Sequence, residues 1–200
     1  MIKDKHIKEA EEVISSIIGL QLVSMRRTAH VNIYEFGKLD EETLLKGEGR
    51  LNIRDENGKE LIRVFERKGK FMLTSMCAMR FIKDDKIYLT GQDFYIPKES
   101  EMAREDFNLD DFDWYEDESL FEETVENHFK GGYDGYIVTE AKVRKFGDLT
   151  IKFENGFEIE LIANGTDYSE NWCFSDYEAR EEEDVFSVHA NGIWRPRTRR

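Results

Sequence analysis

Residues 137–174, IVTEAKVRKFGDLTIKFENGFEIELIANGTDYSENWCF, decide the fold that the sequence predicts. Two runs in this stretch alternate apolar with polar residues, and their apolar members are Leu149, Ile151 and Phe153, then Phe157, Ile159 and Leu161. Strict alternation indicates strands with one buried and one solvated face. The dipeptide Asn155-Gly156 between the runs is typical of a hairpin turn, because both residues tolerate positive φ. We therefore expect three strands joined by tight turns.

The rest of the chain predicts the same kind of antiparallel sheet, backed by two helices. Residues 3–18 carry apolar side chains at helical spacing, and Ser119 with Glu122 forms the capping-box pattern of a second helix near 119–130. Strands are expected within residues 20–96 and 136–190, and the apolar run 70–82 is expected to be one central strand. Because strands and helices do not alternate along the chain, the predicted fold class is α+β.

The two halves of the chain resemble each other in pattern. Val31 and Ile33 match Leu149 and Ile151, and a similar strand follows in each half. We expect a single domain over residues 1–200, with two pseudo-equivalent halves, about 1–97 and 132–194, as one reading of this match. Residues 98–131 would join these halves. Similar strands also arise from pattern alone, so both explanations are open at this point.

Composition and charge narrow the classes of protein. At 40% hydrophobic residues the chain is typical of a folded domain. No apolar run approaches the roughly 18 residues of a membrane helix, and the charged N-terminus is unlike a secretory signal. We therefore expect no membrane association, a cytoplasmic protein, and reduced thiols at Cys77 and Cys173.

The net charge of −14 is concentrated in one stretch, residues 99–126, which we call the acidic segment. This segment holds a single base, Arg104, and thirteen acids, which are Glu99, Glu101, Glu105, Asp106, Asp110, Asp111, Asp113, Glu116, Asp117, Glu118, Glu122, Glu123 and Glu126. Nucleic acid is not an expected partner, because phosphate binding needs a basic face. A solvated loop and helix face is the simplest explanation of such a charge run.

Several stretches together resemble an uncharacterised family of small bacterial proteins. The stretches are SMRRTAHVNIYEFG from Ser24, CAMRFI from Cys77, TGQDFY from Thr90, GDLTIKFENGFEIEL from Gly147 and ENWCF from Glu170. They are similar to C-x-W-R and G-x-x-D motifs early in the family and to G-x-L-x-I-x-F and E-x-W-R-F motifs late. This chain has Met79 in place of the first motif's Trp and Cys173 in place of the last motif's Arg. The family has no established activity, so the resemblance implies no reaction.

Residue patterns for catalysis or metal binding are weak. Asp148, Glu158 and Glu160 are similar to the carboxylates of a magnesium nuclease, but alternation predicts that both glutamates lie on the solvated face. Asp111-x-Asp113 with Glu122 lacks the glycine that a calcium-binding EF-hand needs. The four histidines are scattered along the chain. We therefore assign no catalytic, cofactor or metal residues and expect no cofactor.

The acidic segment carries the functional hypothesis. Aromatic residues lie among its carboxylates, a combination typical of interfaces that use charge for steering and rings for affinity. The expected function is a non-enzymatic protein-binding module for a basic partner, such as an immunity protein that covers a cationic toxin. The expected contact residues are Asp110, Asp111, Asp113, Trp114, Tyr115, Glu116 and Asp117. The alternative is a hydrolase-type enzyme whose site forms only in three dimensions, and the oligomeric state stays open.

Overall fold

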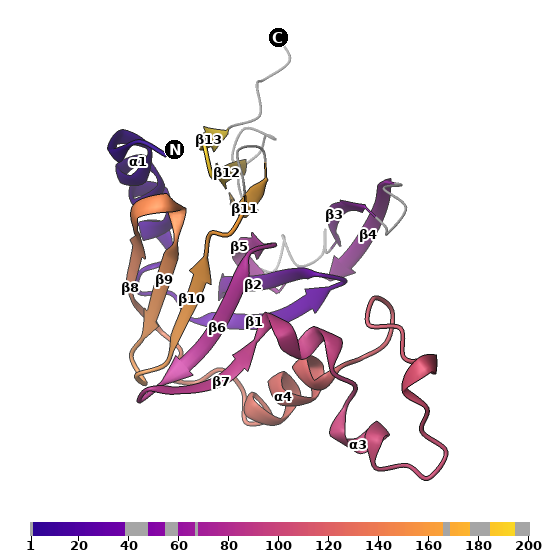
Figure 1. Cartoon of the computed structure of the whole chain (residues 1–200). Coiled ribbons are helices and arrows are strands. Elements are labelled where there is room, and N and C mark those ends of the chain that lie inside the picture. Colours follow the sequence, from indigo (N-terminus) through magenta and orange to yellow (C-terminus); the bar gives the residue numbers. More distant parts are fainter. Residues whose placement is uncertain are drawn as a thin grey trace.

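The α+β fold expected from the sequence is confirmed by a computed structural model of the chain (Figure 1). The structure describes residues 2–38, 48–54, 60–66, 68–165, 169–176 and 185–194. The sequence also predicts a loop from Gly37 to Gly49, a turn at residues 55–58 and a basic tail after Trp194, and these segments lie wholly or largely outside the described residues. All strand pairs described below are antiparallel.

Two sheets hold most of the strands. The six-stranded sheet has the order β1 (Leu22–Thr28), β2 (Val31–Lys38), β5 (Gly69–Ser75), β11 (Glu170–Asp176), β12 (Val185–His189), β13 (Gly192–Trp194). The five-stranded sheet has the order β7 (Lys86–Thr90), β6 (Ala78–Lys83), β10 (Glu158–Ile162), β9 (Leu149–Phe153), β8 (Val138–Val143). A separate hairpin pairs β3 (Glu48–Arg54) with β4 (Glu60–Glu66), as the alternating residues Leu51 and Ile53 before Asn57-Gly58 predict.

Both predicted helices are present. The N-terminal helix α1 (Asp4–Ile14) continues as a short 3-10 turn, η1 (Ser15–Ile17), and ends before Gly19, whose φ is +83°. Helix α4 (Leu120–His128) begins with the predicted capping box at Ser119. Shorter helical turns are η2 (Gly91–Tyr95), α3 (Glu99–Met102), η3 (Leu109–Asp111) and η4 (Lys145–Gly147).

The stretch 137–174 forms a meander, but its extent differs from the prediction. Strands β8, β9 and β10 are consecutive neighbours in one sheet, whereas a fourth strand, β11, joins the other sheet. The turn between β9 and β10 also differs, because Gly156 has a φ of +84° whereas Asn155 does not have a positive φ. The Asn155 side chain instead accepts a hydrogen bond from the backbone of Phe157 at 3.2 Å.

The prediction that residues 70–82 form one central strand is wrong. The chain leaves the six-stranded sheet after Ser75 and enters the five-stranded sheet as β6 at Ala78. The backbone N–H of Met76 donates to the carbonyl of Asn171 at 3.1 Å at this crossing. Both β5 and β6 bury apolar side chains, so the apolar run continues across the break and conceals it.

One core joins both sheets and both long helices. Trp172 is fully buried, and Phe174, Met79 and Phe81 are buried as well. Phe81 stacks on Phe157 with ring centroids 4.7 Å apart. This shared core fixes the position of α4 and therefore of the segment that precedes it.

The two halves of the chain pair their strands in the same way. Strands β1, β2 and β5 lie in the six-stranded sheet and are followed by β6 and β7 in the other. Strands β8, β9 and β10 lie in the five-stranded sheet and are followed by β11 and β12 in the other. A register shift interrupts β1 between Leu22 and Ser24 and β8 between Val138 and Glu140, each opposite a phenylalanine of the neighbouring strand.

The register shifts also show which residues of the two halves match in the structure. Counted from these shifts, Arg27 matches Val143 and Asn32 matches Leu149, whereas the match made from sequence sets Val31 against Leu149. Helix α4 contacts β1 as α1 contacts β8, so a match made on the structure also sets α4 against α1. Such pairing is what a duplicated chain would produce, and the duplication itself stays a prediction.

Candidate partner-binding surface

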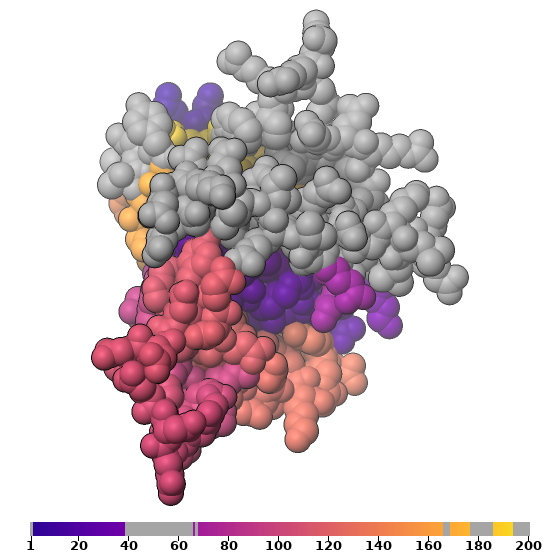
Figure 2. Space-filling view, turned by 90° about the vertical axis from the view of Figure 1, so that its right-hand side faces the viewer, coloured from indigo at the N-terminus to yellow at the C-terminus, as the bar shows by residue number. Residues whose placement is uncertain are grey.

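The part of the acidic segment before α4 projects from the end of the molecule opposite α1 (Figures 1 and 2). The chain leaves the five-stranded sheet at the end of β7, passes through η2, α3 and η3, and returns to the body of the protein at Ser119. Pro97 and Ser119 form an isolated antiparallel bridge at the base of this projection, and the N–H of Leu120 donates to the carbonyl of Ile96 at 2.7 Å. The projection is therefore closed at its base by backbone hydrogen bonding.

Carboxylates of the acidic segment strengthen this base. The Glu123 carboxylate accepts hydrogen bonds from the backbone N–H groups of Glu99 at 2.7 Å and Ser100 at 3.4 Å. Lys98 pairs with Glu118 across the two arms of the projection. Several of the acids thus have a local structural role in addition to their charge.

A buried arginine, Arg27, holds the arm of the projection that leads back to α4 against the six-stranded sheet. Arg27 on β1 donates from Nη1 to the Trp114 carbonyl at 2.9 Å and from Nη2 to the Asp117 carbonyl at 2.8 Å. Its Nε lies 2.6 Å from Oε1 of Glu122 on α4, and its side chain is only 4% exposed. Its guanidinium also lies over the ring of Phe94, 5.2 Å from the centroid.

The five predicted acidic contact residues lie close together and are all exposed. They are Asp110, Asp111, Asp113, Glu116 and Asp117. Two of them also shape the loop, because Asp113 accepts a hydrogen bond from the Tyr115 N–H and Asp117 accepts one from the Asp113 N–H, both at 2.9 Å. Each of these two aspartates can bend the backbone with one oxygen and present the other to solvent.

The two predicted aromatic contact residues are half-buried. Trp114 packs against Tyr95 with ring centroids 4.9 Å apart, and Tyr115 packs against Ala29 and Val31. Both rings therefore help to attach the loop to the body of the protein. The most exposed apolar side chain of the projection is Leu109, at 62%, which the sequence did not single out.

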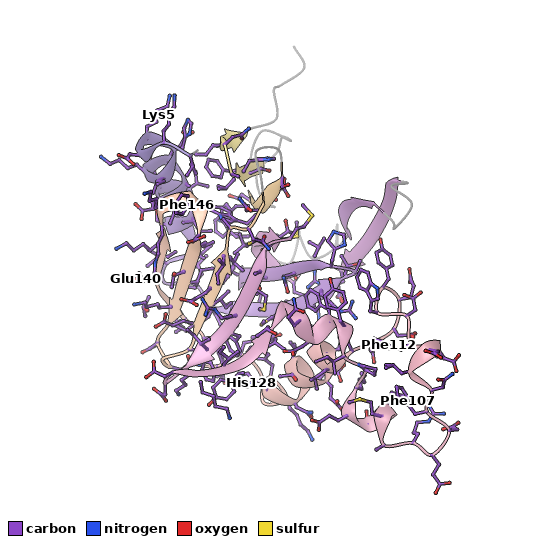
Figure 3. All side chains as sticks on the ribbon, viewed as in Figure 1. Lys5, Phe107, Phe112, His128, Glu140 and Phe146 are labelled. Atoms are coloured by element: carbon purple, nitrogen blue, oxygen red, sulfur yellow. The ribbon has the colours of Figure 1, made fainter. Side chains whose placement is uncertain are left out.

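The projection encloses a hollow of about 520 Å³. Its apolar lining comes from Pro97, Phe107 and Phe112, and the two phenylalanines lie on the projection in Figure 3. Its charged lining residues are Lys98, Glu101, Arg104, Asp106, Asp111, Asp117 and Glu118. Arg104 hydrogen-bonds to Asp106 and lowers the pKa of that carboxyl, whereas Glu118 raises the pKa of Lys98. Lys98 and Arg104 are thus both paired with acids of the acidic segment. The carboxylates that line the hollow outnumber these two cations, so the hollow keeps an excess of negative charge.

The two cysteines and His128, which could serve a hydrolase as nucleophile or base, lie outside the projection and are buried or partly buried. Burial raises the pKa of the Cys77 thiol to about 11 and that of Cys173 to about 12, so neither forms the reactive thiolate at neutral pH. His128, at the end of α4, is hydrogen-bonded to the Tyr136 hydroxyl among aromatic rings, and burial lowers its pKa. Within the described residues, no group of three or more His, Cys, Asp or Glu could hold a metal ion.

Two of the three carboxylates compared with a nuclease site have structural partners. Asp148 accepts a hydrogen bond from the Ala163 N–H at 2.8 Å, and Glu160 pairs with Arg80 at 3.0 Å. Glu158 and Glu160 alternate with the fully buried Ile159 and Leu161 on β10, as predicted. Asp148 and Glu160 therefore have contacts within the fold, and Glu158 lies on the half-exposed face of β10.

Comparison with known proteins gives no further guide to function. No protein-family model, no curated protein and no solved structure matches the chain. Among the described residues, no helix has the length and apolar character needed to cross a membrane.

Proposed function

We propose that the protein is a non-enzymatic binding module for a basic protein partner, and that the projecting part of the acidic segment is its contact surface. An immunity protein that covers a cationic toxin is the concrete form of this proposal. The observation that carries it is the common position of Asp110, Asp111, Asp113, Glu116 and Asp117, all exposed, on one ordered loop that Arg27 attaches to the body.

Charge and order together favour binding over a merely solvated surface. The exposed carboxylates create a negative field that speeds the approach of a basic partner and weakens over a Debye length of about 8 Å at physiological salt. The internal hydrogen bonds of the loop reduce the conformational entropy that an unfolded acidic stretch would lose on binding. Exposed apolar side chains on the same projection, Leu109 at 62% and Met102 at 42%, supply surface whose burial does not depend on salt.

The experiment compares three versions of the full chain as affinity baits in a lysate of the native cell. The first is wild type, and the second carries Asp110→Asn, Asp111→Asn, Asp113→Asn, Glu116→Gln and Asp117→Asn. The third is a matched control with the same loss of charge at exposed acids elsewhere: Glu12→Gln, Asp84→Asn, Asp85→Asn, Asp134→Asn and Glu154→Gln. The amides keep an acceptor oxygen, so the hydrogen bonds of the loop persist.

The proposal predicts that wild type and the control retain one basic protein that the loop variant loses. The purified protein must then bind wild type as an isolated pair, with an association rate that falls as salt rises. Equal retention of all proteins by the three baits contradicts the proposal, and so does retention of acidic proteins only.

A further inference from the structure

We infer that Arg27 is a positioning residue, whose role is to hold residues 112–118, here called the Trp114 loop, in the conformation that presents the acidic contact residues. This inference rests on the proposed function for its consequence in binding, and on the contacts of Arg27 for the rest. Arg27 lies in β1, 87 positions before Trp114, and its guanidinium reaches the carbonyl oxygens of Trp114 and Asp117 at 2.9 and 2.8 Å.

The bonds of Arg27 are directed at the backbone of the Trp114 loop. Bonds to two carbonyl oxygens, 2.9 and 2.8 Å long, fix both ends of the turn that contains Tyr115 and Glu116. A third bond, to the carbonyl of Ala29 at 3.0 Å, ties the same guanidinium to the β1–β2 turn on which Tyr115 packs. The planar fork of arginine makes these bonds together, and a lysine ammonium cannot reproduce that geometry.

The other half of the protein shows that the sheet itself does not need an arginine here. Val143 occupies the position in β8 that Arg27 has in β1, since each lies five positions after the residue at which the register shifts, Val138 in β8 and Leu22 in β1. Val143 is an ordinary buried apolar residue, at 2% exposure. The arginine is therefore required where the Trp114 loop covers the hairpin, and an apolar side chain serves the equivalent strand.

Burial makes the contacts of Arg27 effective. The Arg27 side chain is 4% exposed and that of Glu122 is 22% exposed, so water competes little with the ion pair between them. A small crevice of about 160 Å³ lies where the loop meets the hairpin, and Arg27, Tyr115 and Glu118 are among its lining residues. Loss of the guanidinium would leave the loop attached mainly by its rings and by the base of the projection.

The test uses Arg27→Lys, which keeps the positive charge, and Arg27→Met, which keeps much of the volume. The control is Arg144→Gln, an exposed arginine beside η4, which contacts α1 at the end of the molecule opposite the projection. Amide hydrogen exchange is followed in residues 112–118 and in the reference strands β9 and β10. Exchange in the loop should rise about tenfold or more in Arg27→Lys while the reference strands stay within about twofold, since the lost bonds are local.

Binding of the basic protein captured by wild type gives the second readout. Arg27→Lys should weaken that binding about tenfold, because the loop must then be ordered during association, whereas Arg144→Gln should not. Unchanged loop exchange in both Arg27 variants overturns the inference. Faster exchange with unchanged binding also overturns the positioning role. In either case the proposed function fails as well only if the variant whose five loop acids are changed to amides also binds like wild type.

If Arg27→Met does not fold, Arg27→Lys still decides the question, because it retains the charge opposite Glu122. If capture yields no basic protein, the proposed function is contradicted, and the exchange measurement alone still decides whether Arg27 holds the loop.

Discussion

Arg27 and Glu122 join the six-stranded sheet to helix α4, with Nε and Oε1 2.6 Å apart. Arg27 belongs to the edge strand β1 of the six-stranded sheet, and Glu122 belongs to the first turn of α4. The same glutamate completes the capping box by accepting a hydrogen bond from the Ser119 N–H at 2.7 Å. The start of α4, the sheet and the acidic segment are thus coupled through one ion pair.

Removal of the capping serine tests this junction. Ser119 is fully buried and its hydroxyl accepts a hydrogen bond from the Phe121 N–H at 3.2 Å. Ser119→Ala should lower the free energy of unfolding by roughly 1 kcal/mol, the usual effect of losing an N-cap. Urea denaturation measures it, with Ser169→Ala, at an exposed position, as control. Equal midpoints for Ser119→Ala and wild type would show that the capping box adds nothing.

Trp172 is the largest test of the core. Its ring is fully buried and its Nε1 donates to the Gly147 carbonyl at 2.7 Å. Trp172→Ala should destabilise the fold by about 3–5 kcal/mol because it leaves a large cavity. Trp172→Phe should have a smaller effect, since it keeps most of the packing and loses the hydrogen bond. Thermal melting checks both, and a near-wild-type melting temperature for Trp172→Ala would contradict the account of the core.

His128 predicts a change of stability with pH. Burial lowers its pKa below the ordinary 6.5, so above that pH the histidine is neutral in both the folded and the unfolded chain. As pH falls through 6.5, the unfolded chain binds a proton that the folded chain resists, and the fold loses stability. His128→Gln should therefore lose less stability than wild type between pH 7.5 and 5.5 in urea titrations. If both proteins lost the same stability over this range, protonation of His128 would not contribute to the dependence on pH.

The cysteines predict slow alkylation of the native protein. Burial raises the pKa of Cys77 to about 11 and that of Cys173 to about 12, which leaves very little thiolate at pH 7.5. Iodoacetamide should modify both thiols rapidly in urea but only slowly in the native state, as followed by mass spectrometry. Rapid modification of either thiol without urea would instead favour a nucleophilic cysteine and the hydrolase alternative.

Local patterns predicted the parts of the fold that local physics determines. Alternation at Ile159 and Leu161 and the capping box at Ser119 each depend on a few neighbouring residues, and the structure has them. The break at Met76 was not predictable in the same way, because strands in both sheets are buried and the apolar run does not change there. Pairing of β11 with β5, about 100 positions earlier, depends on the whole core.

The candidate surface also combines a feature that the sequence predicts with a long-range contact that it does not predict. Composition was enough to locate the acidic segment, and the exposure of Asp110 and Asp113 agrees with it. The attachment by Arg27 was not predicted, since its partners lie 87 to 95 positions away. Sequence alone contained no signal for it, because the match of Val31 with Leu149 sets Arg27 against Lys145, and only the strand register sets Arg27 against Val143.

The rate of association between the protein and its captured basic partner tests the central claim most directly. Stopped-flow measurements at low salt should give a rate at least about tenfold slower for the five-amide loop variant than for wild type, with circular dichroism unchanged. The five-amide control elsewhere on the surface should associate nearly as fast as wild type. If the loop variant associates as fast as wild type, the acidic segment is a solvated surface and the binding proposal is wrong.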